Sequence, residues 1–300
     1  MLLRVKPCAK NLMTFITSLI DFFFVIIYYC YQKGDFMKRQ EPKRVRNNIV
    51  TKSNHLVRYN KSALTLQEKK FINYAISRLD ESDLKAEDFP QQTFTVDEYC
   101  DTLGIRKDGF YEEMASIARS LLSKPFEIDL PNYKGTGKHI VSFANWFQTC
   151  RYNMTDGNIT VKFHEDIKTY FLQLEGQKTT YRLTNTLFAK KKYMPDWYEL
   201  FRSYISLKNE LEMTVGEIRN FLLISNEKYQ RNNDFVKYCV IEPIEELNKI
   251  TDISVNVEKI TKGRKIVSFK FNFKDKTWQE MLENGQLKLN GQIISDNEEV

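Results

Sequence analysis

The sequence contains few of the residues that build metal centres and disulfide frameworks. Among its 300 residues are three histidines, His55, His139 and His164, none close to another, and five cysteines that are far apart and form no CxxC pair. Structural zinc sites need closely spaced Cys and His ligands, and small secreted folds need paired cysteines. We therefore expect no metal, no cofactor and no disulfide framework, and a reducing, cytoplasmic environment.

Motifs for phosphate transfer or acid–base catalysis are missing as well. Gly135–Lys138 is similar to the end of a phosphate-binding loop, but Asn132 stands where the first glycine belongs and His139 replaces the Ser or Thr. A hairpin turn explains this run better. The pair Glu245 and Glu246 falls on adjacent, divergent helix positions, where we expect solvated surface rather than converging carboxylates. The sequence predicts no enzymatic activity.

One long apolar run is present near the start. Leu12–Tyr31 is long enough to span a bilayer, although Asp21 in its middle would cost about 2.5–3.5 kcal/mol. No small-residue cleavage site follows it. The codons for Lys33–Met37 can hold a purine-rich ribosome-binding site, so we expect translation to begin at Met37. Residues 1–36 are then a leader outside the native protein; a membrane anchor is the alternative.

The charge is uneven along the chain. The net charge is +6, the stretch Met37–Lys61 is strongly basic, and the end, Gln279–Val300, is acidic. We expect a basic arm over residues 37–53, which either lies along a polyanion or is a solvated tail, and a flexible acidic tail over 277–300. A basic folded middle attracts polyanions such as DNA through phosphate neutralisation.

The first predicted domain covers residues 54–176. Helical and alternating apolar spacing predicts a helix, a strand, a helix–turn–helix and a hairpin, followed by one more strand and helix. Asp97 is the expected cap of the first helix of the helix–turn–helix, and Pro131–Lys138 is the expected hairpin tip. The predicted elements are Leu64–Leu79, Phe94–Val96, Asp97–Leu103, Asp108–Ser123, Phe126–Leu130, His139–Phe147, Ile159–Phe163 and His164–Leu174.

The second predicted domain, residues 177–276, repeats this order after a connecting stretch that ends in Lys190–Lys192. Thr214 and Glu217 form a predicted capping box, and Pro243 is expected to kink the longest helix. The predicted elements are Asp196–Leu207, Thr214–Leu223, Asp234–Ile250, Ile253–Ile260 and Lys265–Phe273. The pattern indicates an α+β protein with two tandem winged-helix domains of similar topology.

The chain resembles the replication initiators that act at iteron-bearing plasmid origins, a family of tandem winged-helix proteins. The resemblance covers Asn47–Phe273 and is carried by Asn47–Leu79, by Val161–Gly176 and above all by Phe235–Phe273, with its core IEPIEELNKITD at Ile241–Asp252. It implies binding to direct origin repeats as a monomer, melting of adjacent A·T-rich DNA, and recruitment of the host helicase and initiator proteins. It also implies a dimer, paired through the first winged helix, that binds an inverted repeat and represses its own gene.

A recognition helix reads base edges near its N-terminus, and surrounding cations contact phosphates. In the second domain the candidates for DNA contact are Lys228, Tyr229, Arg231, Asn232, Asn233, Lys237 and Tyr238, with Lys262, Arg264 and Lys265 in the wing. In the first domain they are Arg106, Lys107, Tyr111 and Arg119, with Lys134 and Lys138 in the wing. Acidic neighbours at Asp108, Glu112 and Glu113 predict weaker DNA contact by the first domain.

Two other functions are alternatives to this one. A rolling-circle initiator would nick DNA with a tyrosine beside a metal that closely spaced histidines hold, and the three separated histidines do not fit that requirement. A winged-helix transcriptional regulator without a role in initiation is the second alternative. If Leu12–Tyr31 is translated and inserted, that regulator would be tethered to a membrane.

Overall fold

The computed structural model describes residues 48–79, 88–107, 109–130, 137, 140–153, 155–172 and 178–283. The apolar run Leu12–Tyr31, the Met37 start, residues 37–47 of the basic arm and residues 284–300 of the acidic tail lie outside these ranges and stay predictions. The start of the predicted flexible tail, Trp278–Glu283, is instead a helix. Within them, no helix has the length and apolar character needed to cross a bilayer. All described residues belong to one compact unit.

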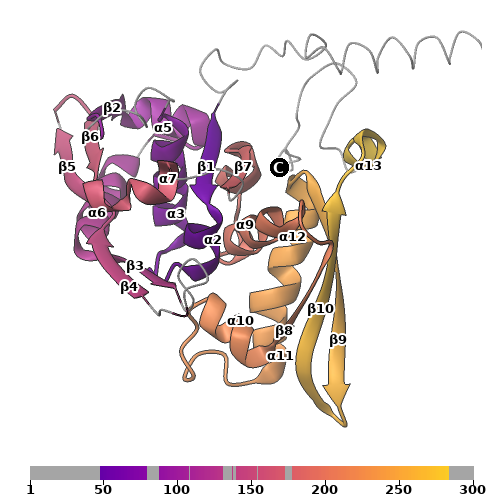
Figure 1. Ribbon diagram of the computed structural model, residues 1–300. Helices are drawn as coiled ribbons and strands as arrows, with labels where there is room; N and C mark the ends of the chain where they lie inside the picture. Colours follow the sequence, from indigo (N-terminus) through magenta and orange to yellow (C-terminus); the bar gives the residue numbers. More distant parts are fainter. Residues whose placement is uncertain are drawn as a thin grey trace, which may run out of the picture. The chain divides into compact units, whose positions relative to one another are not determined.

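The first domain contains a helix–turn–helix flanked by short antiparallel sheets (Figure 1). Strands β2, β6 and β5 form one sheet in the order β2-β6-β5, while β3 pairs with β4. The single strand predicted over His139–Phe147 is two strands, because the chain breaks at the buried Trp146 and β5 joins β6 instead. The bounds are α3 Leu66–Ser77, β2 Gln92–Thr95, α5 Val96–Leu103, α6 Phe110–Ser123, β3 Pro125–Leu130, β4 Ile140–Asn145, β5 Phe147–Asn153 and β6 Asn158–Phe163.

Reciprocal capping boxes begin two helices of this domain, α3 and α5. Thr65 accepts from the amide of Glu68, whose carboxylate accepts from the amide of Thr65, and this begins α3. Thr95 and Glu98 make the same exchange at α5. The prediction that Asp97 caps this helix was wrong. Asp97 already lies in the first turn, and Thr95 is the residue with a glutamate three positions on.

A strand and a helix precede the predicted start of the first domain. Strand β1, Ile49–Ser53, pairs antiparallel with β7, Lys178–Arg182, and the short helix α2, Asn54–Tyr59, follows it. Lys52 is 7% exposed and its Nζ lies 2.7 Å from Glu199 Oε1. The assignment of residues up to 53 to a basic arm was therefore wrong for Ile49–Ser53.

The described residues between the two domains form regular elements as well. The helix predicted over His164–Leu174 is a 3₁₀ turn, Glu165–Ile167, followed by the short helix α7, Thr169–Leu172. The stretch predicted as a connection contains β7 and then helix α8, Thr184–Leu187. Strand β7 completes a sheet with β1 from the other end of the first domain, which explains why an isolated sequence window did not show it.

The second domain contains a helix–turn–helix and a long hairpin, β9–β10 (Figure 1). Its sheet has the order β8-β10-β9 and is antiparallel throughout. The predicted capping box of Thr214 and Glu217 is confirmed at the start of α10. The bounds are α9 Met194–Tyr204, β8 Glu210–Thr214, α10 Val215–Phe221, α11 Asn232–Phe235, a π-helical segment Val236–Ile241, α12 Glu242–Ile250, β9 Ile253–Lys262, β10 Lys265–Asp275 and α13 Trp278–Glu283.

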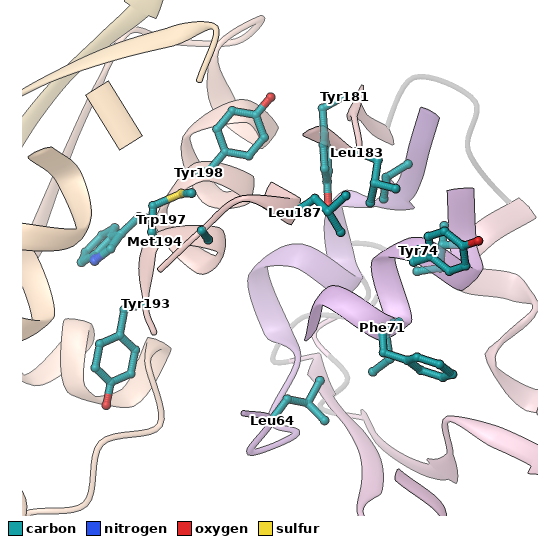
Figure 2. Close-up of a cluster of buried hydrophobic side chains, with 14 of the residues drawn as sticks. Leu64, Phe71, Tyr74, Tyr181, Leu183, Leu187, Tyr193, Met194, Trp197 and Tyr198 are labelled. Atoms are coloured by element: carbon teal, nitrogen blue, oxygen red, sulfur yellow. The ribbon is translucent and has the colours of Figure 1, made fainter. Parts of the chain in front are cut away.

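One continuous hydrophobic cluster extends from the first domain into the second. Figure 2 shows Phe71 and Tyr74 of α3 at one side of the cluster, Trp197 of α9 at the other, and Leu183 and Leu187 between them. These five side chains are at most 2% exposed. Since apolar burial is the main stabilising contribution to folding, α9 is held by both domains at once.

Candidate nucleic-acid interface

The recognition helix of the second domain is continuous from Asn232 to Ile250 but changes its hydrogen-bond pattern in the middle. Pro243 has no N–H, so the carbonyl of Cys239, four residues earlier, lacks its usual helical donor. The indole Nε1 of Trp197 donates to that carbonyl instead, at 2.7 Å. The π-helical segment Val236–Ile241 ends two residues before this proline. Next to the proline that is predicted to kink this helix, the structure thus has a π-helical segment, and α9 supplies the donor that the proline lacks.

The start of this helix separates a buried face from an exposed one. Phe235, Val236, Cys239 and Val240 are buried. The predicted contact residues Arg231, Asn232, Asn233, Lys237 and Tyr238 are exposed, and so is Lys228 in the preceding loop. Polar donors therefore gather on the outer side of the helix start, as base reading in a major groove requires.

The loop before the recognition helix is held by an arginine that the sequence analysis did not select. Arg219 of α10 donates from its guanidinium to the backbone carbonyls of Lys228, at 3.0 Å, and Tyr229, at 2.7 Å. Its guanidinium carbon also lies 4.6 Å from the centre of the Phe235 ring. Tyr229, predicted to contact DNA, is only half-exposed and adopts a left-handed φ of 53°. The turn geometry thus depends on Arg219.

The wing of the second domain is the tip of the β9–β10 hairpin. Lys262 and Lys265 pair across the turn, and Gly263 takes a φ of 63°, which favours glycine. Lys262, Arg264 and Lys265 are all exposed. Three cations at a hairpin tip suit contact with phosphates.

In the first domain, some of the predicted contact residues are exposed and others are paired with Asp97. Arg106 and Arg119 are exposed, whereas Lys107 Nζ lies 3.2 Å from Asp97 Oδ2 and Tyr111 donates its hydroxyl to Asp97 Oδ1 at 3.2 Å. The hydrogen bond to Asp97 raises the pKa of Lys107. Because Asp97 balances this charge locally, the lysine has less electrostatic attraction for phosphate. Lys134 and Lys138 lie outside the described residues.

Two family models match the chain in this order. The model described as Initiator Replication protein, WH1, matches residues 49–202, and the model described as Initiator Rep protein, WH2, matches residues 214–273. The chain belongs to the Rep initiator family. The tandem winged-helix fold predicted from the sequence is thereby confirmed.

The solved structure of an initiator protein supports this fold. The chain is similar to the Pi initiator protein, solved in complex with iteron DNA, with a TM-score of 0.62 and 21% identity over 77% of this chain and 98% of that one. Domains 2 and 3 of RctB match over 79% of this chain and 94% of theirs, with a TM-score of 0.42 and 11% identity. None of the curated protein sequences compared with the chain matches it.

In this Rep initiator, the distinctive run Ile241–Asp252 joins the recognition helix to its surroundings. The side-chain amide of Asn248 donates to the carbonyl of Val255 at 2.8 Å and accepts from its amide at 2.7 Å, which ties α12 to β9. Tyr198 of α9 donates its hydroxyl to Asp252 at 2.9 Å. The motif therefore determines how the helix, the wing and α9 are placed relative to one another.

Glu246 in the same run is not the solvated surface residue that was predicted. Its two carboxylate oxygens accept from the backbone amides of Lys190 and Lys191, each at 2.8 Å. Glu245 is exposed, as expected. Adjacent positions on α12 thus have different roles, because only one of them faces the connection between the domains.

The polar groups at this surface of the Rep initiator differ from those of a metal centre or a reactive thiol. Across the described ranges, no three His, Cys, Asp or Glu side chains are grouped so that they could hold a metal ion. Burial raises the pKa of the Cys239 thiol to about 12 and that of Cys100 to about 11, so neither is a thiolate near neutral pH. Exposed amides, guanidinium groups and ammonium groups remain as the functional groups of the surface.

Proposed function

We propose that the chain is a plasmid replication initiator that binds repeated sequences, iterons, at its origin through both winged helices. The observation that carries the proposal is the exposed group Arg231, Asn232 and Asn233 at the start of a recognition helix that Arg219 and Trp197 hold, in a domain whose wing tip carries three exposed cations. Arg and Asn make bidentate contacts with guanine and adenine, respectively. Membership of the Rep initiator family and the fold of the Pi initiator support it.

Melting of the origin and recruitment of host proteins would need no catalysis by this chain. The sequence has no complete phosphate-binding loop, so the energy for melting A·T-rich DNA would come from protein binding and the deformation of the DNA. This step would take place in the cytoplasm. The host helicase and initiator proteins would then be recruited to the melted region. The chain itself would perform no catalytic step.

The direct test is a titration of residues 37–300 against labelled origin DNA of the same replicon, at fixed salt and with unrelated competitor DNA. We expect saturable binding in evenly spaced steps that resists the competitor. A transformation assay with the origin and this gene on a plasmid without another replicon then separates initiation from regulation. Repeat binding without replication would favour the winged-helix regulator over the initiator.

Replacing Arg231 by alanine should weaken repeat binding by about 1–3 kcal/mol at one base position, because a bidentate contact is lost. Affinity for unrelated DNA should change little. Lys262→Ala is the matched comparison: it should lower affinity for all sequences and reduce the salt slope by about one. Competition binding at several salt concentrations measures both effects. Equal losses on repeat and random DNA for Arg231→Ala would refute its role in base reading.

The same protein is proposed to form a dimer through its first domain and to repress its own gene in that form. Strand β4 pairs with β3 on one side, and its Phe143 and Val141 side chains are 67% and 42% exposed. An exposed aromatic on a strand of a two-stranded sheet is a ready site for pairing with a second copy.

Phe143→Glu should shift the protein towards the monomer by roughly tenfold or more in dissociation constant, since a charge would be buried in the interface. Sedimentation equilibrium of residues 37–300 measures this shift. Leu207→Glu, which changes a side chain that is 69% exposed in the second domain, is the control. An equal shift in both variants, or none in Phe143→Glu, would place the interface elsewhere.

A further inference from the structure

The lysine-rich connection Lys190–Lys192 is attached to the helix that continues the recognition helix. Glu246 of α12 accepts from the amides of Lys190 and Lys191 at 2.8 Å each. One turn earlier on α12, Glu242 Oε2 lies 2.7 Å from Lys191 Nζ. The backbone of the connection is thus held by α12 and keeps a fixed position relative to the recognition helix.

Lys192 ends this connection beside the loop Ser225–Arg231 that precedes the recognition helix, here called the recognition loop. Tyr193, next to Lys192, shares a side-chain hydrogen bond with Tyr229, next to Lys228 of that loop. The side chain of Lys192 reaches the surface, but partial burial of its ammonium group lowers its pKa, and the charges of Lys228 and Lys69 lower it further. Lys69 is already neutralised, because its Nζ lies 2.5 Å from Asp196. Among the residues that the structure describes, neither Lys192 nor Lys228 forms an ion pair, and both are exposed.

The two cations are also held in place. Lys228 Nζ lies 5.6 Å from the centre of the Tyr229 ring, and Lys192 Nζ lies 5.1 Å from that of Tyr193. Arg219 holds the carbonyl of Lys228 at 3.0 Å. Two ammonium groups kept near each other repel, and this repulsion is relieved when an anion binds between them. The arrangement is that of an anion site on the side of the recognition loop.

We infer that Lys192 and Lys228 clamp a phosphate of the DNA backbone, and that the connection Lys190–Lys192 is part of the DNA-binding surface of the second domain. This inference rests on the proposed function. Duplex DNA is the occupant that fits, because the site lies on the recognition loop, which leads directly into the helix start with Arg231 and Asn232. A phosphate contact at this place would set the register of the helix in the groove without reading sequence.

The first experiment compares Lys192→Gln with Lys178→Gln, an exposed lysine on β7 that belongs to no proposed site. Lys192→Gln should bind repeat and unrelated DNA roughly threefold to tenfold more weakly and lower the salt slope by about 0.9, the value for one phosphate. Lys178→Gln should match the wild type. Unchanged affinity and slope in Lys192→Gln, in a protein that still binds repeats, would overturn the clamp. A wild type without repeat preference would instead remove the proposed function.

The second experiment tests a substitution for which the clamp and simple electrostatics predict opposite changes in DNA affinity. Glu246→Gln removes a negative charge, which by itself should strengthen DNA binding, as we expect for the exposed neighbour in Glu245→Gln. The glutamine amide would, however, place an N–H₂ against the amide of Lys190 or Lys191 and release the connection. We expect weaker binding for Glu246→Gln and a salt slope close to that of Lys192→Gln. Tighter binding in both glutamate variants would contradict the positioning role.

A third measurement identifies the anion. Methylphosphonates, which are uncharged, replace single phosphates along one repeat, and the wild type should lose affinity at the contacted phosphate. Lys192→Gln should be insensitive there, since the pair is already broken. Calorimetric titration with inorganic phosphate alone should give no saturable binding. Saturable phosphate binding that Lys192→Gln abolishes, without a methylphosphonate effect, would assign the site to a free anion rather than to DNA.

Discussion

Replacing Glu68 by alanine should lower the free energy of unfolding by about 2–4 kcal/mol, because it removes the acceptor of a buried network. Glu68 is 2% exposed, and its carboxylate accepts from Lys124 Nζ at 2.6 and 2.8 Å, from Ser120 Oγ and from the amide of Thr65. Its loss leaves the start of α3 uncapped and Lys124 without its partner. The half-buried ammonium of Lys124 can turn towards water, so the cost should not exceed this range.

The same network makes stability depend on pH. Burial alone would raise the pKa of Glu68, but the hydrogen bonds from Lys124, Ser120 and Thr65 outweigh it and lower the pKa. A carboxylate whose pKa is lower in the folded state than in the unfolded state stabilises the fold at pH values above the unfolded pKa. This stabilisation is lost as the pH falls through the pKa of the folded state. The wild type should therefore lose stability in acid, whereas Glu68→Gln should show less of this loss.

Urea unfolding of residues 37–300 at pH 7 and near pH 4 measures both effects. Glu112→Ala, an exposed glutamate on α6, is the control and should change the free energy of unfolding by less than about 0.5 kcal/mol. If Glu68→Ala were no less stable than this control, Glu68 would not be the link between α3 and α6.

Local signals in the sequence predicted the helix starts better than the sheets. The box of Thr214 and Glu217 was found because both partners lie within one turn. The same spacing of threonine and glutamate begins α3 at Thr65 and α5 at Thr95, whereas the incorrect prediction of Asp97 rested only on aspartate being a common cap. Strand β1 was missed because its partner β7 is more than a hundred residues away and because Lys52, in its middle, suggested an exposed arm.

The candidate interface shows the same division between local and distant information. Helix start and wing tip were predicted from residue type and periodicity, and six of the seven residues proposed around the recognition helix are exposed. Three features could not be predicted: the ion pair of Lys107 with Asp97, the hydrogen bonds from Arg219 to the recognition loop, and the position of Lys192 beside that loop. Each depends on how separate elements pack, which no single sequence window contains.

Trp197→Ala should be the most destabilising single change, costing about 3–5 kcal/mol. The indole is fully buried, and its ring centre lies 4.9 Å from that of Phe271 and 5.5 Å from that of Phe201. Trp197→Phe keeps most of the apolar contact but leaves the Cys239 carbonyl without a donor, which should cost about 1–3 kcal/mol on its own. Urea unfolding gives both values.

A double-mutant cycle with Pro243 isolates that hydrogen bond. Pro243→Ala restores an N–H that can reach the carbonyl of Cys239, so the loss of the indole donor should then matter less. We expect Trp197→Phe to cost about 1 kcal/mol less in the Pro243→Ala background than in the wild type. Additive effects would mean that proline and tryptophan act independently. If the coupling is found, the π-helical turn of the recognition helix is set by α9, and Pro243→Ala should also weaken repeat binding by moving Asn232 and Asn233 relative to the wing.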